Sequence, residues 1–221
     1  MFTREEWLIG DKINLIKDKC VLIIGLGGVG GYTLESLVRA GISKVIIVDN
    51  DNIDITNLNR QIISLNDNIG KKKVDEWEKR IKNINPLVEV IKYDLFVTSE
   101  NINEIFGHNI DYVVDACDTI DTKKAIIRTC IKNNIKFITS MGTGNKLDPT
   151  KIEICDIRKT SYDPIAKIIR KMVKDERIKS KIMTVCSTEQ PKIKGKVGSI
   201  SFVPSVAGLY ITSYIINDIL S

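Results

Sequence analysis

The chain has 221 residues, of which 43% are hydrophobic and 28% charged, and 33 basic against 28 acidic side chains give a formal net charge of +5. This length suits one α/β domain with a sizeable core, and the composition is ordinary for a soluble globular protein. No apolar run looks long enough to cross a bilayer, so no membrane segment is expected. The start, MFTREEWLIG, lacks the basic-then-apolar order of a secretory signal, which favours a cytoplasmic location.

The use of cysteine and histidine excludes several kinds of site. The five cysteines are Cys20, Cys117, Cys130, Cys155 and Cys186. None of them forms a C-x-x-C pair, so the usual spacing of zinc ligands is missing and no structural zinc is expected. Reduced and mostly buried thiols are the simpler interpretation. His108 is the only histidine, which excludes any mechanism that needs two.

The first 140 residues alternate between predicted strands and helices, after a short helical arm over residues 1–19. The predicted strands are 21–24, 44–48, 88–93, 112–116 and 135–140, and the predicted helices are 30–40, 71–84, 99–106 and 120–133. Such alternation predicts an α/β fold with a Rossmann-like, mostly parallel sheet, right-handed crossovers and flanking helices. Ligands of these sheets bind beyond the carboxyl ends of the strands.

After residue 144 the pattern changes to a C-terminal strand and helix extension. The expected order is a strand over 151–157, a helix over 164–174, a basic turn-rich stretch over 179–196, a strand over 199–203 and a helix over 204–220. Apolar side chains at helical spacing define the first of these helices. Pro204 suits the first turn of the second, where its missing N–H is not needed.

The string VLIIGLGGVGG, residues 21–31, joins a buried strand to a helix through a glycine-rich turn. Its glycines Gly25, Gly27 and Gly30 form G-x-G-x-x-G, with Gly28 in addition. Without side chains the backbone turns sharply and approaches a phosphate closely, while the next helix offers unpaired N–H groups. Asp49, at the end of the following strand, suits the hydroxyls of a ribose. These features predict an adenine-nucleotide site, and by themselves they favour an NAD enzyme.

Four polar segments exceed what a dinucleotide site needs. They are DNDNID at 49–54, TNLNRQ at 56–61, GKKKVD at 70–75 and DACDT at 115–119. Together they place Arg60, a lysine and Asp118 around the glycine turn, and a triphosphate under attack needs such cations and an acid to hold magnesium. Lysines at the start of a helix oppose its dipole unless something anionic compensates. Lys71 and Lys72 are interpreted as solvated charges.

With these segments, residues 3–140 resemble the adenylation core of ubiquitin-activating enzymes and their bacterial, ThiF-type relatives. The resemblance implies that a carboxylate attacks the α-phosphate of ATP, which gives an acyl adenylate and pyrophosphate. It implies that Asp49 binds the ribose and that Asp118 holds Mg²⁺, while Asn57, Arg60 and Lys73 bind the phosphates. The whole implied ATP-binding set is Gly25, Gly27, Gly28, Gly30, Asp49, Asp51, Asn57, Arg60, Gln61, Lys73 and Asp118. Arg4 matches an arm that reaches the partner's ATP in a homodimer, so the implied catalytic residues are Arg4, Arg60, Lys73 and Asp118.

The second half narrows the resemblance to the tRNA threonylcarbamoyladenosine dehydratases. Residues 140–171, CSTEQP at 186–191 and GSISFVPSVAGL at 198–209 carry it, so the similarity covers nearly the whole chain. It implies one ThiF-type adenylation domain over 1–221, with an N-terminal arm (1–19), a nucleotide-binding core (20–144) and a substrate- and tRNA-binding part (145–221). Such enzymes adenylate the threonylcarbamoyl carboxylate on a tRNA adenosine. The adjacent carbamoyl group then closes the ring and AMP leaves, so the substrate supplies its own nucleophile.

The distribution of charge in the second half of the chain bears on binding of a tRNA. Between residues 167 and 196, ten basic side chains stand against three acidic ones, as a tRNA backbone would require, and a solvated surface is the alternative. The expected tRNA contacts are Lys167, Arg170, Lys171, Lys174, Lys192, Lys194 and Lys196.

Cys186 lies in an expected loop, but Thr184 occupies the place of a cysteine found in some dehydratases. A thioester step through Cys186 is therefore not favoured.

The expected partners are a tRNA carrying threonylcarbamoyladenosine and a second copy of the chain, and no membrane is expected. Binding of a sulfur-relay protein is left open. The expected cofactors are ATP and Mg²⁺, with a monovalent cation also left open. Three rival functions remain. They are adenylation of the C-terminal glycine of a ubiquitin-like sulfur carrier, an NAD-binding oxidoreductase, and a nucleotide-sensing scaffold without chemistry.

Overall fold

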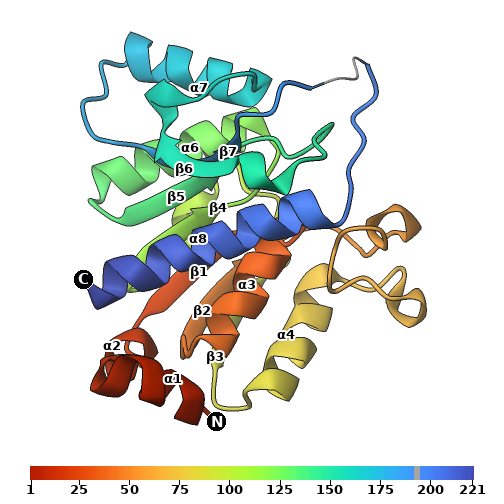
Figure 1. Ribbon diagram of the computed structural model, residues 1–221, viewed down its shortest axis with the longest axis vertical. Coiled ribbons are helices and arrows are strands. Elements are labelled where there is room, and N and C mark those ends of the chain that lie inside the picture. The colour runs from red at the N-terminus through yellow and green to blue at the C-terminus, as the bar shows by residue number, and fades with distance from the viewer. Residues whose placement is uncertain (192–194) are drawn as a thin grey trace.

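The computed structural model describes residues 1–191 and 195–221, and at its centre lies a seven-stranded sheet (Figure 1). The strands are β1 (Cys20–Ile24), β2 (Lys44–Val48), β3 (Glu89–Tyr93), β4 (Tyr112–Asp115), β5 (Lys136–Ser140), β6 (Ile152–Asp156) and β7 (Met183–Ser187). The helices are α1 (Thr3–Ile9), α2 (Ile13–Lys17), α3 (Gly30–Arg39), α4 (Lys73–Ile84), α5 (Ile102–Ile105), α6 (Ile120–Lys132), α7 (Pro164–Asp175) and α8 (Phe202–Leu220). Short 3-10 turns lie at 10–12, 55–57, 66–68, 149–151 and 157–159.

The strands follow the order β3-β2-β1-β4-β5-β7-β6, and all neighbours are parallel except β6 and β7. From β1 the chain runs to one side through β2 and β3, and then to the other side through β4 and β5. Where strand order reverses in this way, the loops after neighbouring strands diverge and leave a crevice. The expected Rossmann-like, mostly parallel sheet is confirmed, and its crevice lies at the carboxyl ends of β1 and β4.

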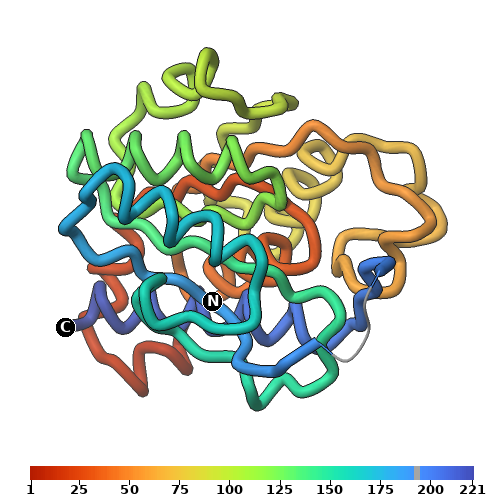
Figure 2. The backbone as a smooth tube through the Cα atoms, turned by 90° about the horizontal axis from the view of Figure 1, so that it is seen from above, coloured from red at the N-terminus to blue at the C-terminus, as the bar shows by residue number. Residues whose placement is uncertain are grey.

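Side chains of the central strands point alternately into two apolar layers. Val21 and Ile23 of β1 join the layer that α3, α4 and α8 cover, while Leu22 and Ile24 join the layer under α5 and α6. Figure 2, turned by 90°, shows α6 and α8 on opposite sides of the sheet. Because both faces of a parallel sheet are buried, the strand reads as a continuous apolar run without polar alternation.

Helix α8 packs directly on α3, the helix that begins at the glycine turn. A side-chain carbon at Gly208 would lie 2.5 Å from the Val29 carbonyl oxygen, so only glycine permits this approach. The Thr33 hydroxyl donates to the Gly208 carbonyl oxygen (3.1 Å), and the Thr212 hydroxyl donates to the Thr33 carbonyl oxygen (3.2 Å). The contact holds the first turn of α8 beside the glycine turn, where Pro204 lines the crevice.

Two expectations for the C-terminal part are wrong. The stretch 179–196 was expected to be turn-rich, but it contains β7, because a strand of five residues is too short to show a period. Residues 199–203 were expected as a strand, but 199–201 are irregular and α8 already begins at Phe202. Here the side chain of Asn59 donates to the Ser199 carbonyl oxygen (2.9 Å), so a loop contact takes the place of a strand pairing.

Helix α8 also corrects the expectation about membrane segments. By length and composition alone, Phe202–Leu220 is apolar enough to cross a bilayer. In the structure its side chains Ala207, Ile211 and Ile215 are buried in the layer shared with α3 and the sheet. One side of the helix is therefore packed in the core of the domain, and burial of that side needs apolar side chains for the same physical reason.

Candidate active site

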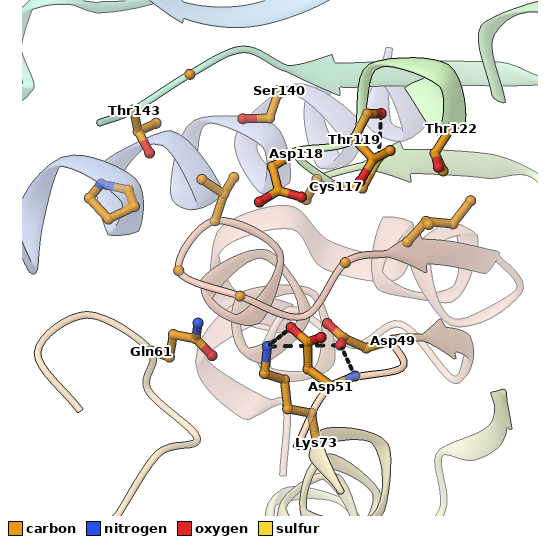
Figure 3. A pocket seen from close by; sticks show the side chains of 18 of the residues that line it. Asp49, Asp51, Gln61, Lys73, Cys117, Asp118, Thr119, Thr122, Ser140 and Thr143 are labelled. Atoms are coloured by element: carbon orange, nitrogen blue, oxygen red, sulfur yellow. Dashed lines mark hydrogen bonds and ion pairs between the residues drawn. The ribbon is translucent and has the colours of Figure 1, made fainter. Parts of the chain in front are cut away.

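A cavity of about 840 Å³ opens where the strand order reverses (Figure 3). Its walls come from the glycine turn after β1 and from the segments 48–51, 56–61, 116–119 and 140–144, with Lys73 and Pro204. In Figure 3 the glycine turn passes between two groups of polar side chains, with Asp49, Asp51 and Lys73 on one side and Asp118 on the other. The structure therefore brings together the predicted ATP-binding residues, of which all but Gly30 line the cavity.

Two glycines of the turn are fixed by close backbone contacts. Gly25 has a φ of +89°, and a side-chain carbon there would lie 2.7 Å from the Ala116 carbonyl oxygen. At Gly30 it would lie only 1.8 Å from the Gly25 carbonyl oxygen. Gly30 therefore shapes the turn from behind, which is why it does not line the cavity. The N–H groups of Gly27 and Gly28 have no hydrogen-bond partner among the described residues, so they can bind an anion.

Asp49 ends β2 and holds the glycine turn in place. Its Oδ2 accepts a hydrogen bond from the Leu26 N–H at 2.7 Å, and its Oδ1 accepts one from the Asp51 N–H at 2.9 Å. The side chain is 7% exposed, and burial raises the pKa of its carboxyl while the Lys73 ammonium, 3.8 Å away, opposes that rise. Each carboxylate oxygen can accept a second hydrogen bond, so the group remains suited to ribose hydroxyls.

Lys73 begins α4, where a cation is unfavourable unless an anion compensates it. Its ammonium lies 2.7 Å from Asp51 Oδ2 as well as close to Asp49, and its side chain is 4% exposed. The two acids are thus the compensating anions, and they hold the positive charge at the wall of the cavity. Lys71 and Lys72 lie outside the cavity lining.

The segment after β2 brings three further polar side chains to the cavity. Asn57 is held through its Oδ1 by the capping box of a 3-10 turn. Arg60 Nη1 donates to the Thr56 carbonyl oxygen (2.8 Å) and to Asn59 Oδ1 (2.9 Å), which leaves Nε and Nη2 for an anion. Gln61 is buried, and its Oε1 has no hydrogen-bond partner among the described residues. A buried acceptor without a partner in a cavity wall leaves room for one hydrogen bond, which a ligand or a water molecule in the cavity can donate.

Asp118 faces this group from the loop after β4 (Figure 3). The residue is exposed, and its carboxylate makes no hydrogen bond or ion pair with another described residue. The cavity therefore has cations near one wall and a free carboxylate at the opposite wall. That combination can bind a polyphosphate together with a hard divalent cation.

Beneath the Asp118 loop lies a buried ion pair that sequence reasoning missed. Lys123 of α6 donates to Asp115 Oδ2 at 3.0 Å, both side chains are at most 1% exposed, and the Thr139 hydroxyl donates to the same oxygen at 2.5 Å. Burial and the Asp115 carboxylate hold the pKa of the neighbouring Cys117 thiol far above its usual range. The network fixes the loop that carries Asp118. The only signal for this ion pair in the sequence is a lysine that lies about one turn into the helix, on its apolar face.

The structure does not bring Arg4 to the cavity of its own chain. Arg4 is exposed on α1, and nearby in the chain Lys12 donates to the Leu220 carbonyl oxygen at 2.8 Å. Leu220 lies about 24 Å along α8 from Pro204, which lines the cavity. Figure 1 accordingly shows α1 and α2 beside the C-terminal end of α8.

The predicted tRNA contacts fall into three groups. The exposed ones are Lys167, Lys171 and Lys174, which lie along one side of α7, and Lys196. Arg170 instead donates to the Thr160 carbonyl oxygen at 2.9 Å, so it supports the segment before the helix. Lys192 and Lys194 lie outside the described residues.

Cys186 is not in a loop, contrary to expectation. It lies in β7 and is 2% exposed, and burial raises the pKa of its thiol far above the usual range. Because the thiolate is the nucleophile and burial disfavours it, this position is unsuited to a thioester step.

Comparisons with known proteins agree with this geometry. The sequence pattern of the ThiF family matches residues 7–217. The tRNA threonylcarbamoyladenosine dehydratase of Bacillus subtilis is 39% identical over 99% of this chain and 94% of its own length. The chain belongs to the tRNA threonylcarbamoyladenosine dehydratases of the ThiF family. The resemblance read from the sequence is confirmed.

A solved member of this dehydratase family has nearly the same fold. The crystal structure of the Escherichia coli tRNA N6-threonylcarbamoyladenosine dehydratase, in complex with ATP, matches with a TM-score of 0.94 at 33% identity, over 99% of this chain and 93% of that one. A sulfur carrier protein adenylyltransferase of Thermus thermophilus is 38% identical, but over only 49% of this chain and 40% of its own length. The sulfur-carrier enzymes are therefore more distant relatives than the dehydratases.

Proposed function

We propose that this chain uses ATP to dehydrate threonylcarbamoyladenosine in tRNA to its cyclic form. The observation that carries the proposal is one cavity with unpaired N–H groups at the glycine turn, the Lys73 ammonium and the free Asp118 carboxylate. A dinucleotide needs only the backbone N–H groups and a ribose acid, whereas a triphosphate under attack needs the other two groups as well. Similarity to a tRNA threonylcarbamoyladenosine dehydratase over 99% of the chain supports the substrate.

The reaction has two steps. First, an oxygen of the threonylcarbamoyl carboxylate attacks the α-phosphorus of ATP, and the bond to pyrophosphate breaks. Arg60 and Lys73 lie where they can stabilise the negative charge that develops on the phosphates. Second, the carbamoyl group attacks the activated carbonyl carbon and loses a proton, and AMP leaves with the former carboxylate oxygen. The nucleoside has then lost the elements of water, and the chain contributes mainly orientation to the ring closure.

Asp118 is the residue proposed to hold Mg²⁺. Its carboxylate is exposed to the cavity and has no ionic partner among the described residues, which fits a hard cation that prefers oxygen ligands. When bound with ATP, Mg²⁺ neutralises phosphate charge. The buried pair of Asp115 and Lys123 keeps the loop of Asp118 in position. The monovalent cation stays a prediction from the resemblance.

A homodimer in which Arg4 completes the cavity of the partner is part of the same proposal. Trp7 and Leu8 of α1 are 79% and 84% exposed, and Leu209 and Tyr210 on the outer side of α8 are exposed as well. Large apolar side chains exposed on helix surfaces are typical of interaction surfaces. Because Arg4 lies far from its own cavity, action across a symmetric interface is the route by which it can contact a triphosphate.

The tRNA is proposed to lie along α7. Lys167, Lys171 and Lys174 offer three positive charges on one side of the helix, at the spacing of successive turns. Ile165, in the first turn of the same helix, lines the cavity. A tRNA backbone on this surface therefore has the cavity mouth beside it. A cytoplasmic location without membrane attachment belongs to the proposal, and a sulfur-relay partner stays a prediction.

The test is an ATP–pyrophosphate exchange assay with purified chain. We expect exchange to depend on tRNA that carries threonylcarbamoyladenosine, and we expect mass spectrometry to show that the nucleoside loses one water. Exchange that depends on a ubiquitin-like sulfur carrier, and not on the tRNA, would favour the alternative adenylyltransferase. Binding of NADH without binding of ATP would contradict both adenylation functions.

A further inference from the structure

A second group of ligating side chains lies away from the cavity, on the sheet face that α7 covers. Glu153 and Cys155 of β6 and Cys186 of β7 gather there, and one ligand atom from each lies within 4.8 Å of the others. Strand pairing brings them together. The antiparallel register sets Glu153 opposite Cys186, and Cys155 follows two residues along on the same face.

We propose that Glu153, Cys155 and Cys186 form a binding site for a zinc ion. The two sulfur atoms are 3.7 Å apart. With zinc–sulfur bonds of about 2.3 Å, a tetrahedral ion separates two thiolates by about 3.8 Å. The thiols therefore already have the spacing of two zinc ligands, and they are much farther apart than the roughly 2.05 Å of a disulfide.

Ligand chemistry and charge agree with this site. Two thiolates and one carboxylate suit zinc, with a water in the fourth position. Cys186 is buried, whereas Glu153 belongs to the edge strand, and its accessible carboxylate already lies near the sulfurs. The three anionic ligands carry one negative charge more than Zn²⁺. The Lys146 ammonium, which faces the carboxylates of Asp163 and Glu189, also interacts electrostatically with Cys186 and offsets part of that charge.

The position of the site determines what the ion would do. It joins the edge strand β6 to β7, and the chain after β7 supports the loop that follows the cavity wall. Glu189 accepts hydrogen bonds there from the N–H groups of Leu147 and Asp148, both at 2.9 Å. The zinc ion therefore stabilises the substrate side of the fold and takes no part in the chemistry of ATP.

The expectation of no structural zinc rested on the absence of C-x-x-C pairs, which detects only ligands that are close in the sequence. Cys155 and Cys186 are 31 residues apart. Their proximity arises from the pairing of β6 with β7, and β7 was not predicted. Sequence spacing could not have revealed this group.

Cobalt binding tests the site on the whole chain, stripped of metal by a chelator and kept reduced. We expect one Co²⁺ per chain, with thiolate-to-cobalt charge-transfer bands and the strong visible bands of tetrahedral cobalt, and we expect Zn²⁺ to displace it. At a zinc concentration a hundredfold above the dissociation constant, Tm should rise by about 5–10 °C. Binding without thiolate bands would overturn the proposal.

Variants separate this site from adventitious binding. Cys155→Ser and Glu153→Gln should each weaken Co²⁺ binding by roughly tenfold or more, and Glu153→Gln changes an accessible position that should not impair folding. Cys20→Ser, a buried thiol of β1, should bind Co²⁺ like the unaltered chain. Unchanged affinity in both ligand variants would overturn the proposal. So would a reduced chain that binds no Co²⁺ while Cys155 and Cys186 form a disulfide on oxidation, which would assign the pair to redox chemistry.

Discussion

Replacing Lys73 by methionine removes the ammonium that faces Asp49 and Asp51. Breaking a fully buried ion pair costs about 3–5 kcal/mol. Here the Asp49 side chain is 7% exposed but that of Asp51 is 60% exposed, so water can replace part of the lost interaction. Asp49 also keeps its hydrogen bonds from two backbone N–H groups. We therefore expect Lys73→Met to lower the free energy of unfolding by about 2 kcal/mol at neutral pH.

The loss of stability of the Lys73→Met variant should depend on pH. Burial raises the pKa of Asp49 in the folded chain and Lys73 opposes the rise, so Lys73→Met should raise that pKa further. A raised folded pKa destabilises the fold only where the carboxyl is ionised. The loss of stability is therefore complete at neutral pH. It disappears as the pH falls to about 4, the pKa of the Asp49 carboxyl in the unfolded chain. Urea unfolding measures it, with a midpoint lowered by about 1 M at neutral pH.

Lys73→Met should impair catalysis more than it impairs stability. Loss of one preorganised charge near the reacting phosphate lowers rates by about 10²–10³, so tRNA-dependent pyrophosphate exchange should fall by that factor. Lys71→Met makes the same charge change at an exposed position outside the cavity, and it should keep stability within about 0.5 kcal/mol. Exchange close to the unaltered rate in a folded Lys73→Met enzyme would refute the phosphate role of Lys73.

Three further outcomes are expected. Asp118→Ala should abolish AMP formation without moving the urea midpoint, because Mg²⁺ loses its proposed ligand, and an active folded variant would contradict that role. An equal mixture of Arg4→Ala and Asp118→Ala chains should recover about a quarter of the activity, since half of the dimers are mixed and each has one complete site. No recovery in verified heterodimers would exclude action of Arg4 in trans. Replacing Lys167, Lys171 and Lys174 by glutamate should make the negative slope of log K against log salt concentration in tRNA binding less steep by about 2–3. An unchanged slope would place the tRNA surface elsewhere than on α7.

The features predicted well are those that short stretches of sequence determine. Gly25 and Asp49 follow two adjacent buried strands, so their meeting at the carboxyl edge of the sheet follows from topology alone. Contacts between distant segments were missed because no local pattern records them. The pair of Asp115 and Lys123 needs a helix facing a strand end, and β7 gains its stability from its neighbours rather than from its own periodicity. The sequence showed that an anion must offset Lys73, but identifying Asp49 and Asp51 as that pair of anions required the structure.

The packing of α8 on α3 has a consequence for synthesis. The ribosome makes β1 and the glycine turn early, but Pro204 and Gly208, which close one side of that turn, come from much later in the chain. A growing polypeptide whose first five strands have already formed still lacks this wall. Nucleotide affinity should therefore appear late in translation.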